Sequence, residues 1–159
     1  KKDYYNGDIP FIKSGEIHKN HTEQFISEKA LKNSSAKMVE KGDLIYALYG
    51  ATSGEVGISK VAGAINQAIL CVRTSLNTVY LLNYLKLQKE NILKTYLQGG
   101  QGNLSAEIIK SLEILTPTYS EQVLIANSLS SFDEKIEAEK KILVRYEKLK
   151  KYLIQQLFI

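Results

Sequence analysis

One uninterrupted stretch decides the architecture of this chain: residues 120–159 are SEQVLIANSLSSFDEKIEAEKKILVRYEKLKKYLIQQLFI, without a glycine or a proline. The absence of both helix-breaking residues predicts one continuous helix, with Ser120 as its N-cap. A helix of about 37 residues is roughly 55 Å long at a rise of about 1.5 Å per residue. A domain of this size cannot cover that length, so we expect a helical arm at 120–159 after a globular part at 1–119.

The apolar residues of the arm follow a heptad spacing. A first seam, interrupted by the polar Glu139, consists of Ile125, Leu129, Phe132, Ile136 and Leu143. A second seam, displaced by three residues, consists of Ile142, Tyr146, Leu149 and Leu153. Such seams predict a coiled coil, so the arm is expected to need a partner helix. The basic residues from Lys140 to Lys151 are expected to form a solvated helix face, with a phosphate or partner surface as the alternative.

The sequence before Pro117 has the patterns of a mixed α/β domain. Runs rich in β-branched and aromatic residues predict strands at 9–13, 43–48, 56–59, 68–74 and 112–115. Helical spacing predicts a helix at 78–97, and Ser105 can cap a short helix through Lys110. Pro10 inside the first run indicates a strand start or an edge. The expected fold class is therefore α+β, with a globular domain followed by a long helix.

Composition and charge narrow the function only slightly. Of the 159 residues, 44% are hydrophobic and 24% are charged, as in an ordinary globular domain. The net charge of +4 weakly favours a polyanionic partner. No run approaches the roughly 20 apolar residues that a membrane helix needs, and no export signal follows Lys1. The single cysteine, Cys71, is expected to be a buried small hydrophobe, which suits a reducing cytoplasm.

The motifs of common enzymes are missing. No phosphate-binding GxxxxGK[ST] loop occurs, and the glycines at 99–102 follow a helix instead of the strand that a dinucleotide loop requires. The segment 50–54 resembles a nucleophile elbow, but Thr52 stands where the serine belongs. The chain has only two prolines, neither followed by another, so it lacks the Asn/Asp-Pro-Pro-Tyr motif of amino-methyltransferases. His18 and His21 could ligate a metal, but we expect solvated side chains there and no metal site.

Positive signals for function lie in three polar loops, at 13–21, 49–54 and 98–103. A DNA-reading protein needs cations for phosphates and hydrogen-bonding side chains for base edges. The candidate DNA-binding residues in these loops are Lys13, Ser14, Lys19, Tyr49, Thr52, Ser53, Gln98, Gln101 and Asn103. On composition alone, an ordinary glycine-rich turn remains the alternative for each loop. Tyr46, on its predicted strand, is expected to pack in the core.

Several blocks of the chain together resemble the specificity subunit of type I restriction–modification systems. They lie at 7–17, 41–45, 50–57, 64–68, 101–105, 121–136 and 155–158. The first five are similar to the opening, central and closing blocks of a target-recognition domain. The last two are similar to the helix that follows each such domain. The blocks occur in the order of the family and span nearly the whole chain.

The resemblance implies a subunit that selects the DNA sequence and has no catalytic residue. Separate modification subunits methylate adenine in such systems, and a motor subunit cleaves. S-adenosylmethionine, ATP and Mg are therefore expected on partner subunits, and this chain is expected to bind no cofactor. The partners expected are double-stranded DNA, the modification subunits and, through the complex, the motor subunit, with no membrane.

Full-length members of this family carry two recognition domains, whose helices pair antiparallel, and each domain binds half of a split target. This chain resembles one domain with one helix, so we expect a homodimer or pairing with a second specificity half. It begins at Lys1 and is expected to lack the family's segment before Gly7-Asp8. Two alternatives come from other classes: a helical dimerisation or scaffold protein without a DNA role, and a hydrolase acting through Thr52-Ser53, for which no positioned base is apparent.

Overall fold

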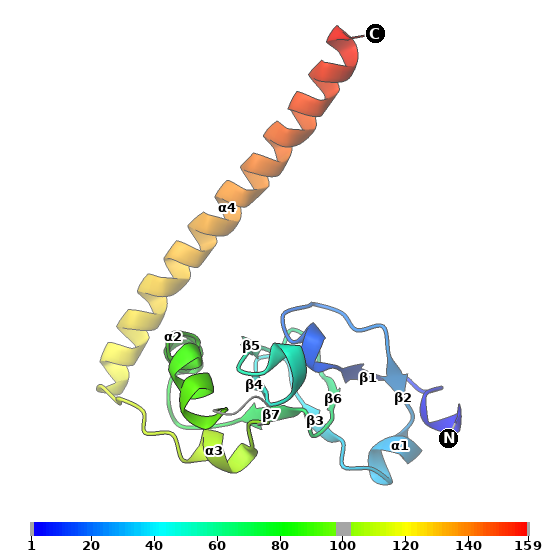
Figure 1. The fold of residues 1–159 in the computed structure, drawn as a ribbon, viewed down its shortest axis with the longest axis vertical. Coiled ribbons are helices and arrows are strands. Elements are labelled where there is room, and N and C mark those ends of the chain that lie inside the picture. Colours follow the sequence, from blue (N-terminus) through cyan, green and yellow to red (C-terminus); the bar gives the residue numbers. More distant parts are fainter. Residues whose placement is uncertain (1, 98–102, 159) are drawn as a thin grey trace. The chain divides into compact units, whose positions relative to one another are not determined.

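A computed structural model describes residues 2–97 and 103–158 and separates two compact units, Lys1–Thr116 and Pro117–Ile159 (Figure 1). The first unit mixes short strands with helices and the second is a long helix, which confirms the α+β class. The helices of the first unit, with η for a 3-10 helix, are η1 (Lys2–Tyr4), η2 (Ser14–Glu16), α1 (Glu28–Lys32), η3 (Gly50–Thr52), α2 (Thr78–Tyr96) and α3 (Ala106–Lys110). Its strands are β1 (Ile9–Ile12), β2 (Phe25–Ile26), β3 (Lys37–Val39), β4 (Leu44–Ala47), β5 (Val56–Ile58), β6 (Gly63–Ile65) and β7 (Ile69–Val72).

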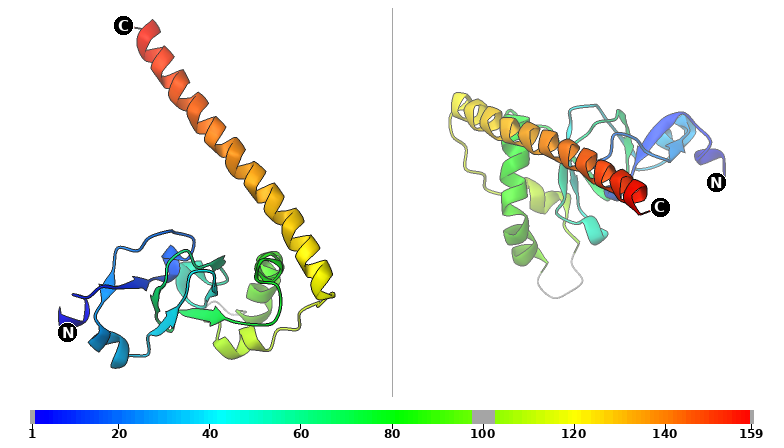
Figure 2. Two further views of the ribbon diagram at one scale, coloured as in Figure 1. Left: turned by 180° about the vertical axis from the view of Figure 1, so that it is seen from behind. Right: turned by 90° about the horizontal axis from the view of Figure 1, so that it is seen from above.

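The strands form two small sheets. The three-stranded sheet, in the order β5-β4-β7, is antiparallel throughout, with Leu44 paired to Ile58 on one side and to Val72 on the other. The four-stranded sheet, in the order β2-β1-β6-β3, contains one parallel pair, β1 with β6. Figures 1 and 2 show α2 on one side of the three-stranded sheet and the four-stranded sheet on its other side.

Strand β4 is the centre of the first unit because both of its faces are buried. Leu44 and Tyr46 pack with Leu81 of α2 in one apolar cluster. Ile45 and Ala47 point the other way and pack in a second cluster with residues of the four-stranded sheet. A strand buried on both faces needs a continuous apolar run rather than an alternating one. The prediction that Tyr46 lies in the core is confirmed, since its exposed fraction is 0%.

Most of the predicted elements of the first unit are confirmed. The strands expected at 9–13, 43–48, 56–59 and 68–74 and the helices expected at 78–97 and 105–110 occur with ends that differ by at most two residues. The Asn77 side chain caps α2 by accepting hydrogen bonds from the N–H groups of Val79 and Tyr80. The Ser105 hydroxyl caps α3 in the same way through the N–H group of Ile108.

The strand predicted at 112–115 is wrong. This segment belongs to no sheet, and two tyrosine hydroxyls of α2 take the place of a neighbouring strand. Tyr80 donates to the carbonyl oxygen of Leu115 at 2.7 Å, and Tyr84 donates to that of Glu113 at 3.5 Å. The strands β2, β3 and β6 are not predicted, because they have only two or three residues and no long run of β-branched and aromatic residues marks them.

Pro10 lies at the start of β1, as predicted, but β1 is not an edge strand, since it lies between β2 and β6. Phe11 and Ile12 make the pairs with β6, so the missing N–H group of Pro10 falls outside that ladder. Gly63 of β6 lies against Pro10, and a Cβ there would be 2.5 Å from the Pro10 carbonyl oxygen. A glycine is therefore required for this close approach of the two strands.

Cys71 on β7 is half-buried, whereas the sequence predicts a fully buried residue. It packs beside the second apolar cluster, and its backbone pairs with that of Ile45. Burial, together with the negative charge of Asp43, raises the pKa of its thiol. A protonated, partly covered thiol behaves as a small apolar side chain.

Helix α4 (Tyr119–Leu157) begins after Thr118, so the predicted N-cap Ser120 is wrong. The Thr118 hydroxyl accepts a hydrogen bond from the Glu121 N–H group at 3.4 Å, and the Glu121 carboxylate accepts one from the Thr118 N–H group at 2.8 Å. A glutamate three residues after a threonine makes this reciprocal capping box possible. Ser120 has Val123 in that position and cannot form it.

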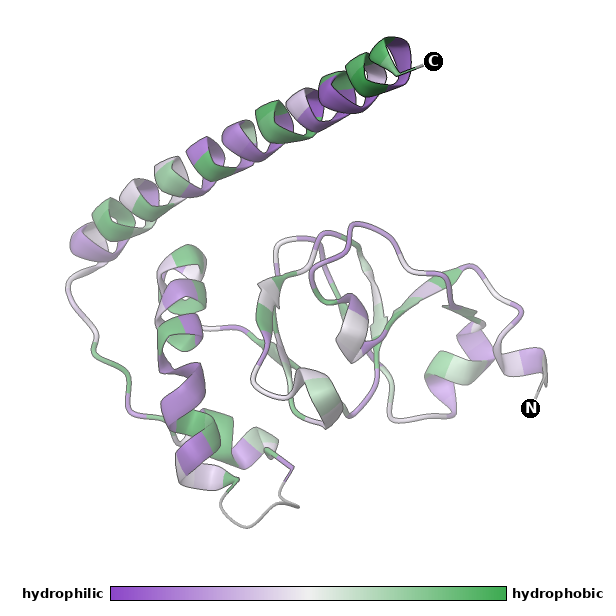
Figure 3. Cartoon of the chain, turned by 45° about the horizontal axis from the view of Figure 1, so that its top comes forward, coloured by the Kyte–Doolittle hydropathy of each residue, from purple (hydrophilic) through white to green (hydrophobic). Residues whose placement is uncertain are grey.

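The seams predicted on α4 consist of exposed side chains. All eight predicted pairing residues are exposed: Ile125, Leu129, Phe132, Ile136, Leu143, Tyr146, Leu149 and Leu153. Figure 3 shows green apolar segments alternating with purple polar ones along this helix. The basic residues between Lys140 and Lys151 are exposed too, and Lys140 forms an ion pair with Glu137 at 2.8 Å. Pairing of the seams with a second helix stays a prediction.

Candidate nucleic-acid interface

Two of the three predicted DNA loops are joined by one hydrogen bond. The loop at 13–21 contains η2, and the loop at 49–54 contains η3 and leads into Glu55. Nε2 of His18 lies 3.1 Å from Oε2 of Glu55. His18 is exposed, as expected, but the hydrogen bond connects its side chain to Glu55. The two partners are 37 residues apart, and no pattern in the sequence predicts their contact.

The residue after the third loop is hydrogen-bonded to the residue before the second. The N–H group of Leu104 donates to the carbonyl oxygen of Leu48 at 3.1 Å, which places the neighbouring Asn103 beside the start of the 49–54 loop. Asn103 is exposed and can make contacts with a ligand. The other two candidates of this loop, Gln98 and Gln101, lie outside the described residues.

The candidate side chains differ in what they can offer to DNA. Lys13 and Lys19 are exposed, and Ser14, Tyr49 and Thr52 are half-buried. The Ser53 hydroxyl donates to the Leu48 carbonyl oxygen at 3.0 Å, so it stabilises its own loop. A serine nucleophile would instead need a base as its acceptor.

A buried carboxylate holds the first loop in shape. Glu16 is 9% exposed and accepts hydrogen bonds from the Thr22 hydroxyl at 3.0 Å and from the Lys13 N–H group at 3.2 Å. Burial opposes ionisation of this carboxyl, but the hydrogen bonds from Lys13 and Thr22, with the charge of Lys19, leave its pKa below the ordinary value. The ionised Glu16 thus fixes the backbone next to Lys13, one of the candidate phosphate contacts.

Two adjoining hollows near these loops contain polar residues that the sequence analysis misses. The larger, of about 430 Å³, is lined by Tyr49 together with Lys37, Asn66 and Gln67. The smaller, of about 250 Å³, shares Asn66 and Gln67 and adds Tyr4 to its wall. Amide side chains between a lysine and tyrosines are suited to base edges and to stacking. An amide pair directly after a short strand is the signal that could have pointed to them.

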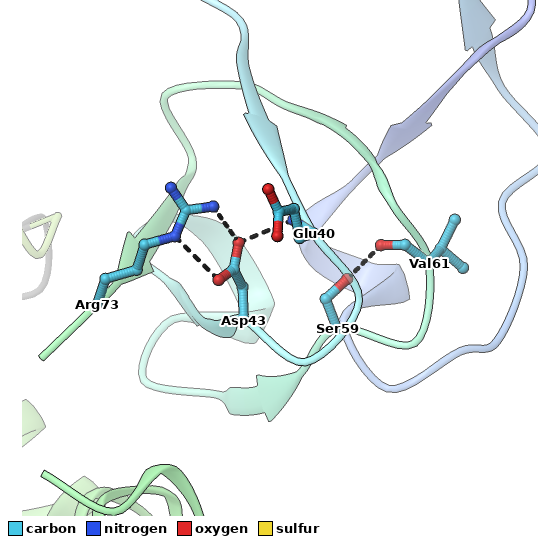
Figure 4. Close-up of polar contacts among 5 residues, drawn as sticks. All are labelled: Glu40, Asp43, Ser59, Val61 and Arg73. Carbon is cyan, nitrogen blue, oxygen red and sulfur yellow. Dashed lines mark hydrogen bonds and ion pairs between the residues drawn. The ribbon is translucent and has the colours of Figure 1, made fainter. Parts of the chain in front are cut away.

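A bidentate ion pair joins the ends of β4 and β7 in the three-stranded sheet (Figure 4). Nε of Arg73 donates to Oδ1 of Asp43 at 2.9 Å and Nη2 donates to Oδ2 at 2.5 Å, while the Glu40 N–H group donates to Oδ2 at 2.8 Å. The Arg73 guanidinium lowers the pKa of Asp43 from 3.8 to about 2 and, with help from the Glu40 N–H group, outweighs the effect of burial. Nearby, the Ser59 hydroxyl donates to the Val61 carbonyl oxygen at 2.7 Å. These bonds fix the turns at the ends of β4, β5 and β7.

The described ranges, 2–97 and 103–158, contain neither a metal-binding cluster nor a membrane-spanning helix. No group of three or more His, Cys, Asp and Glu side chains there is arranged to hold a metal ion. His21, the second histidine of the 13–21 loop, lies 3.0 Å from the Asn20 side-chain oxygen. None of the described helices combines the length and the apolar character that crossing a bilayer requires.

The chain thus combines an α+β domain, which has lysine and amide side chains on adjoining loops, with a helix that carries an exposed apolar stripe. A family described as "Type I restriction modification DNA specificity domain" matches residues 1–148. The chain belongs to this family of type I restriction–modification specificity domains.

Two curated relatives come from Methanocaldococcus jannaschii. The type I restriction enzyme MjaIX specificity subunit is 30% identical over 168 residues, which cover 99% of this chain and 39% of the relative. The MjaVIII specificity subunit is 28% identical over 138 residues, which cover 84% of this chain and 32% of the relative. The chain thus spans well under half of the length of either relative.

Solved structures share the fold at low sequence identity. A chain from a structure on complex assembly and conformational transition of the type I R-M system matches with a TM-score of 0.74 and 20% identity, over 98% of this chain and 39% of its own length. The HsdS subunit from Thermoanaerobacter tengcongensis matches with a TM-score of 0.65 and 18% identity, over 86% of this chain and 33% of its own length. The S subunit from M. genitalium matches with a TM-score of 0.63 and 14% identity, over 100% of this chain and 41% of its own length.

Proposed function

We propose that this chain reads one half of a split double-stranded DNA target, as the specificity subunit, or half of one, of a type I restriction–modification complex. The observation that carries the proposal is the family match over residues 1–148, in which both the globular domain and most of α4 take part. The alternative of a scaffold protein without a DNA role has no comparable support, because the match includes the whole recognition domain.

The chain makes no chemical step of its own under this proposal. Its relatives are named as specificity subunits, which distinguishes them from the subunits that methylate or cleave. The S-adenosylmethionine, ATP and Mg of the complex would be bound by the modification and motor subunits, in the cytoplasm with the DNA. Here, the Ser53 hydroxyl is committed to the Leu48 carbonyl oxygen, which argues against a hydrolase acting through Thr52-Ser53.

The DNA-facing surface would be formed by the joined loops and the hollows beside them. The exposed Lys13 and Lys19 would contact phosphates, since cations on loops supply most of the electrostatic affinity for a duplex. Tyr49 and Asn103, with the newly found Lys37, Asn66 and Gln67, would lie toward the bases. The Thr52 and Ser14 side chains complete the candidate phosphate contacts, whereas the N–H group and the hydroxyl of Ser53 already donate to carbonyl oxygens of their own loop. The two amides Gln98 and Gln101 remain candidates from the sequence.

A DNA-binding selection tests the proposal. The purified chain, alone and with the modification subunits of its own system, is incubated with a pool of random-sequence duplexes, and bound sequences are enriched. We expect a short defined sequence to emerge, and its affinity to fall with salt on a log–log slope of about 0.9 per phosphate contact. Failure to enrich any sequence in either form would overturn the proposal.

Single lysine variants sharpen that test. Lys19→Ala is expected to weaken binding to every duplex alike and to reduce the salt slope by about 1. Lys32→Ala is the matched control, because Lys32 is also exposed but lies on α1, outside the three loops, and is paired with Glu28. Equal salt slopes for the two variants would show that Lys19 contacts no phosphate.

The exposed seams of α4 would pair with the same helix of a second copy or of a second specificity half. A stripe of exposed leucine, isoleucine and aromatic side chains is unfavourable in water and favourable against another such stripe. Pairing would place two recognition domains at a fixed separation, as a split target requires. Heptad spacing in the sequence and exposure in the structure support this assembly independently.

Light scattering tests the pairing. We expect the wild-type chain to be a dimer and Leu129→Glu/Phe132→Glu to be a monomer, because two carboxylates in the seam cannot be buried without partners. Asn127→Glu/Ser131→Glu is the matched control, since it adds the same charge to the opposite face of the same turns. A wild-type monomer would rule out the homodimer and leave a different specificity half as the partner.

A further inference from the structure

The side chain of Glu55 connects three separate elements of the first unit. It follows η3 at the end of the 49–54 loop and immediately precedes β5. Oε1 of Glu55 accepts a hydrogen bond from Nζ of Lys89 on α2 at 2.5 Å, and Oε2 lies 3.1 Å from Nε2 of His18 in the 13–21 loop. One carboxylate thus holds both described DNA-loop candidates and the helix behind them.

The two glycines flanking this region make the close approach possible. Gly54 has a φ of +84°, and a Cβ there would lie 3.2 Å from side-chain atoms of Lys89 and Leu93 on α2. Gly57 lies under the first loop, and a Cβ there would be 2.9 Å from the Ile17 carbonyl oxygen and 3.1 Å from Nδ1 of His18. Any larger residue at 57 would push the first loop away from β5.

The backbone of Glu55 is fixed as well. Its N–H group donates to the Thr52 carbonyl oxygen at 2.9 Å, and its carbonyl oxygen accepts from the Ala47 N–H group at 2.8 Å. The direction of the side chain is therefore set by the β4–β5 hairpin. The Lys89 ammonium first, and then His18, hold the pKa of Glu55 below its ordinary value, so the carboxylate is ionised at neutral pH.

A direct DNA contact is an unfavourable role for this carboxylate. An ionised acid repels phosphates, and its two oxygens are already occupied by Lys89 and His18. By charge alone, removing Glu55 would strengthen binding to a polyanion. Both described contacts of this carboxylate are instead within the protein, where they join the two candidate DNA loops to α2.

We propose that Glu55 is a positioning residue for DNA recognition, which holds the 13–21 and 49–54 loops in one arrangement through His18 and Lys89. In this arrangement the cations of the first loop and Tyr49 of the second meet the same duplex. The inference rests on the proposed function and adds the group that orders its contact surface.

The direction in which a charge-removing substitution changes DNA affinity tests the proposal. Glu55→Gln removes one negative charge, so electrostatics alone would leave DNA affinity equal or tighter. Loss of positioning instead weakens binding to the selected duplex by at least about fivefold, while binding to a scrambled duplex is unchanged or tighter. His18→Gln is expected to reproduce the part of the loss that depends on the first loop, and the double variant to add little to the loss of Glu55→Gln, because His18 acts through Glu55.

His21→Gln is the matched control for His18. His21 is in the same loop and is also exposed, but its contact is with its neighbour Asn20 and not with Glu55. We expect His21→Gln to bind the selected duplex like the wild type. Thermal unfolding of each variant, followed by circular dichroism, confirms that the compared proteins are folded at the assay temperature; His18 is an exposed side chain, so its substitution leaves the core intact.

The possible outcomes separate the two claims. Wild-type protein that selects no sequence would overturn the proposed function, and this inference with it. Selective wild-type binding with an unchanged or tighter Glu55→Gln variant would overturn the inference alone. Additive losses in the His18→Gln/Glu55→Gln double variant would also overturn it, since additivity means that the two residues act separately.

Discussion

The ion pair between Asp43 and Arg73 makes the stability of the first unit depend on pH. Asp43 sits in the turn before β4, and Arg73 follows β7, so the pair joins the ends of two neighbouring strands (Figure 4). The substitution Asp43→Asn keeps the shape of the side chain and can still accept the Glu40 N–H bond. It removes the charge that makes both Arg73 contacts strong.

The expected magnitude follows from the pKa of Asp43. Its lowering from 3.8 to about 2 would correspond to at most about 2.5 kcal/mol of folding free energy. The side chain of Arg73 is 60% exposed, however, and solvent screening reduces the value of such a pair to about 1 kcal/mol. We therefore expect Asp43→Asn to lower the free energy of unfolding by about 1 kcal/mol at neutral pH.

The difference between the two proteins is expected to disappear in acid. A carboxyl whose pKa is lowered by folding stabilises the fold at pH values above its unfolded pKa and loses this contribution as pH falls through the folded pKa. The difference should thus be constant from pH 7 to about pH 5 and shrink as the pH falls from about 4 toward 2. Urea unfolding followed by tyrosine fluorescence at each pH measures it, since the chain contains 10 tyrosines and no tryptophan.

The same substitution in a protein that already lacks Arg73 makes the test specific to the ion pair. In the Arg73→Gln protein, the same Asp43→Asn substitution should cost much less, because the partner is already gone. A loss of stability that is the same at pH 7 and pH 3, or the same with and without Arg73, would refute the role assigned to this ion pair.

Three further predictions concern stability. Tyr46→Phe is expected to raise the free energy of unfolding by about 1 kcal/mol, because the Tyr46 hydroxyl is buried and has no hydrogen-bond partner within the described part of the chain. Urea unfolding measures this free energy, and a lower value for the variant would show that the hydroxyl is hydrogen-bonded. Leu85→Ala should cost about 2–5 kcal/mol, since Leu85 is 2% exposed, whereas Leu87→Ala at a 76% exposed position should change stability by less than about 0.5 kcal/mol. Thr118→Ala removes the N-cap of α4 and should speed amide exchange in its first turn by a factor that corresponds to about 1 kcal/mol; unchanged exchange there would contradict the capping role.

The helical arm and the main strands could be predicted from the sequence because their signals are local. The absence of glycine and proline and the heptad spacing are read within one segment, and the apolar run at 43–48 predicts the strand that the structure shows as β4. The N-cap shows where such reasoning has its limit. Thr118 and Ser120 are both acceptable caps, and the reciprocal bond with Glu121 decides between them.

The candidate site could be predicted only in part. Polar loops with lysine, tyrosine and amide residues are visible in the sequence, and so is the order of the family blocks. The sequence does not show that Ser53 bonds to its own loop, or that Asn66 and Gln67 line two hollows. Short strands such as β6 show no periodic pattern in the sequence, so the positions of the residues that follow them in the fold cannot be predicted.

The sequence by itself therefore determined the class of fold, the long helix at its end, and the family. Only the tertiary structure decided which distant residues meet: Glu55 with His18 and Lys89, Asp43 with Arg73, and Gly63 with Pro10. The physical reason is that local periods and caps depend on neighbours within a few residues. Contacts between loops depend on how the sheets bring separate segments together, and no single segment contains that information.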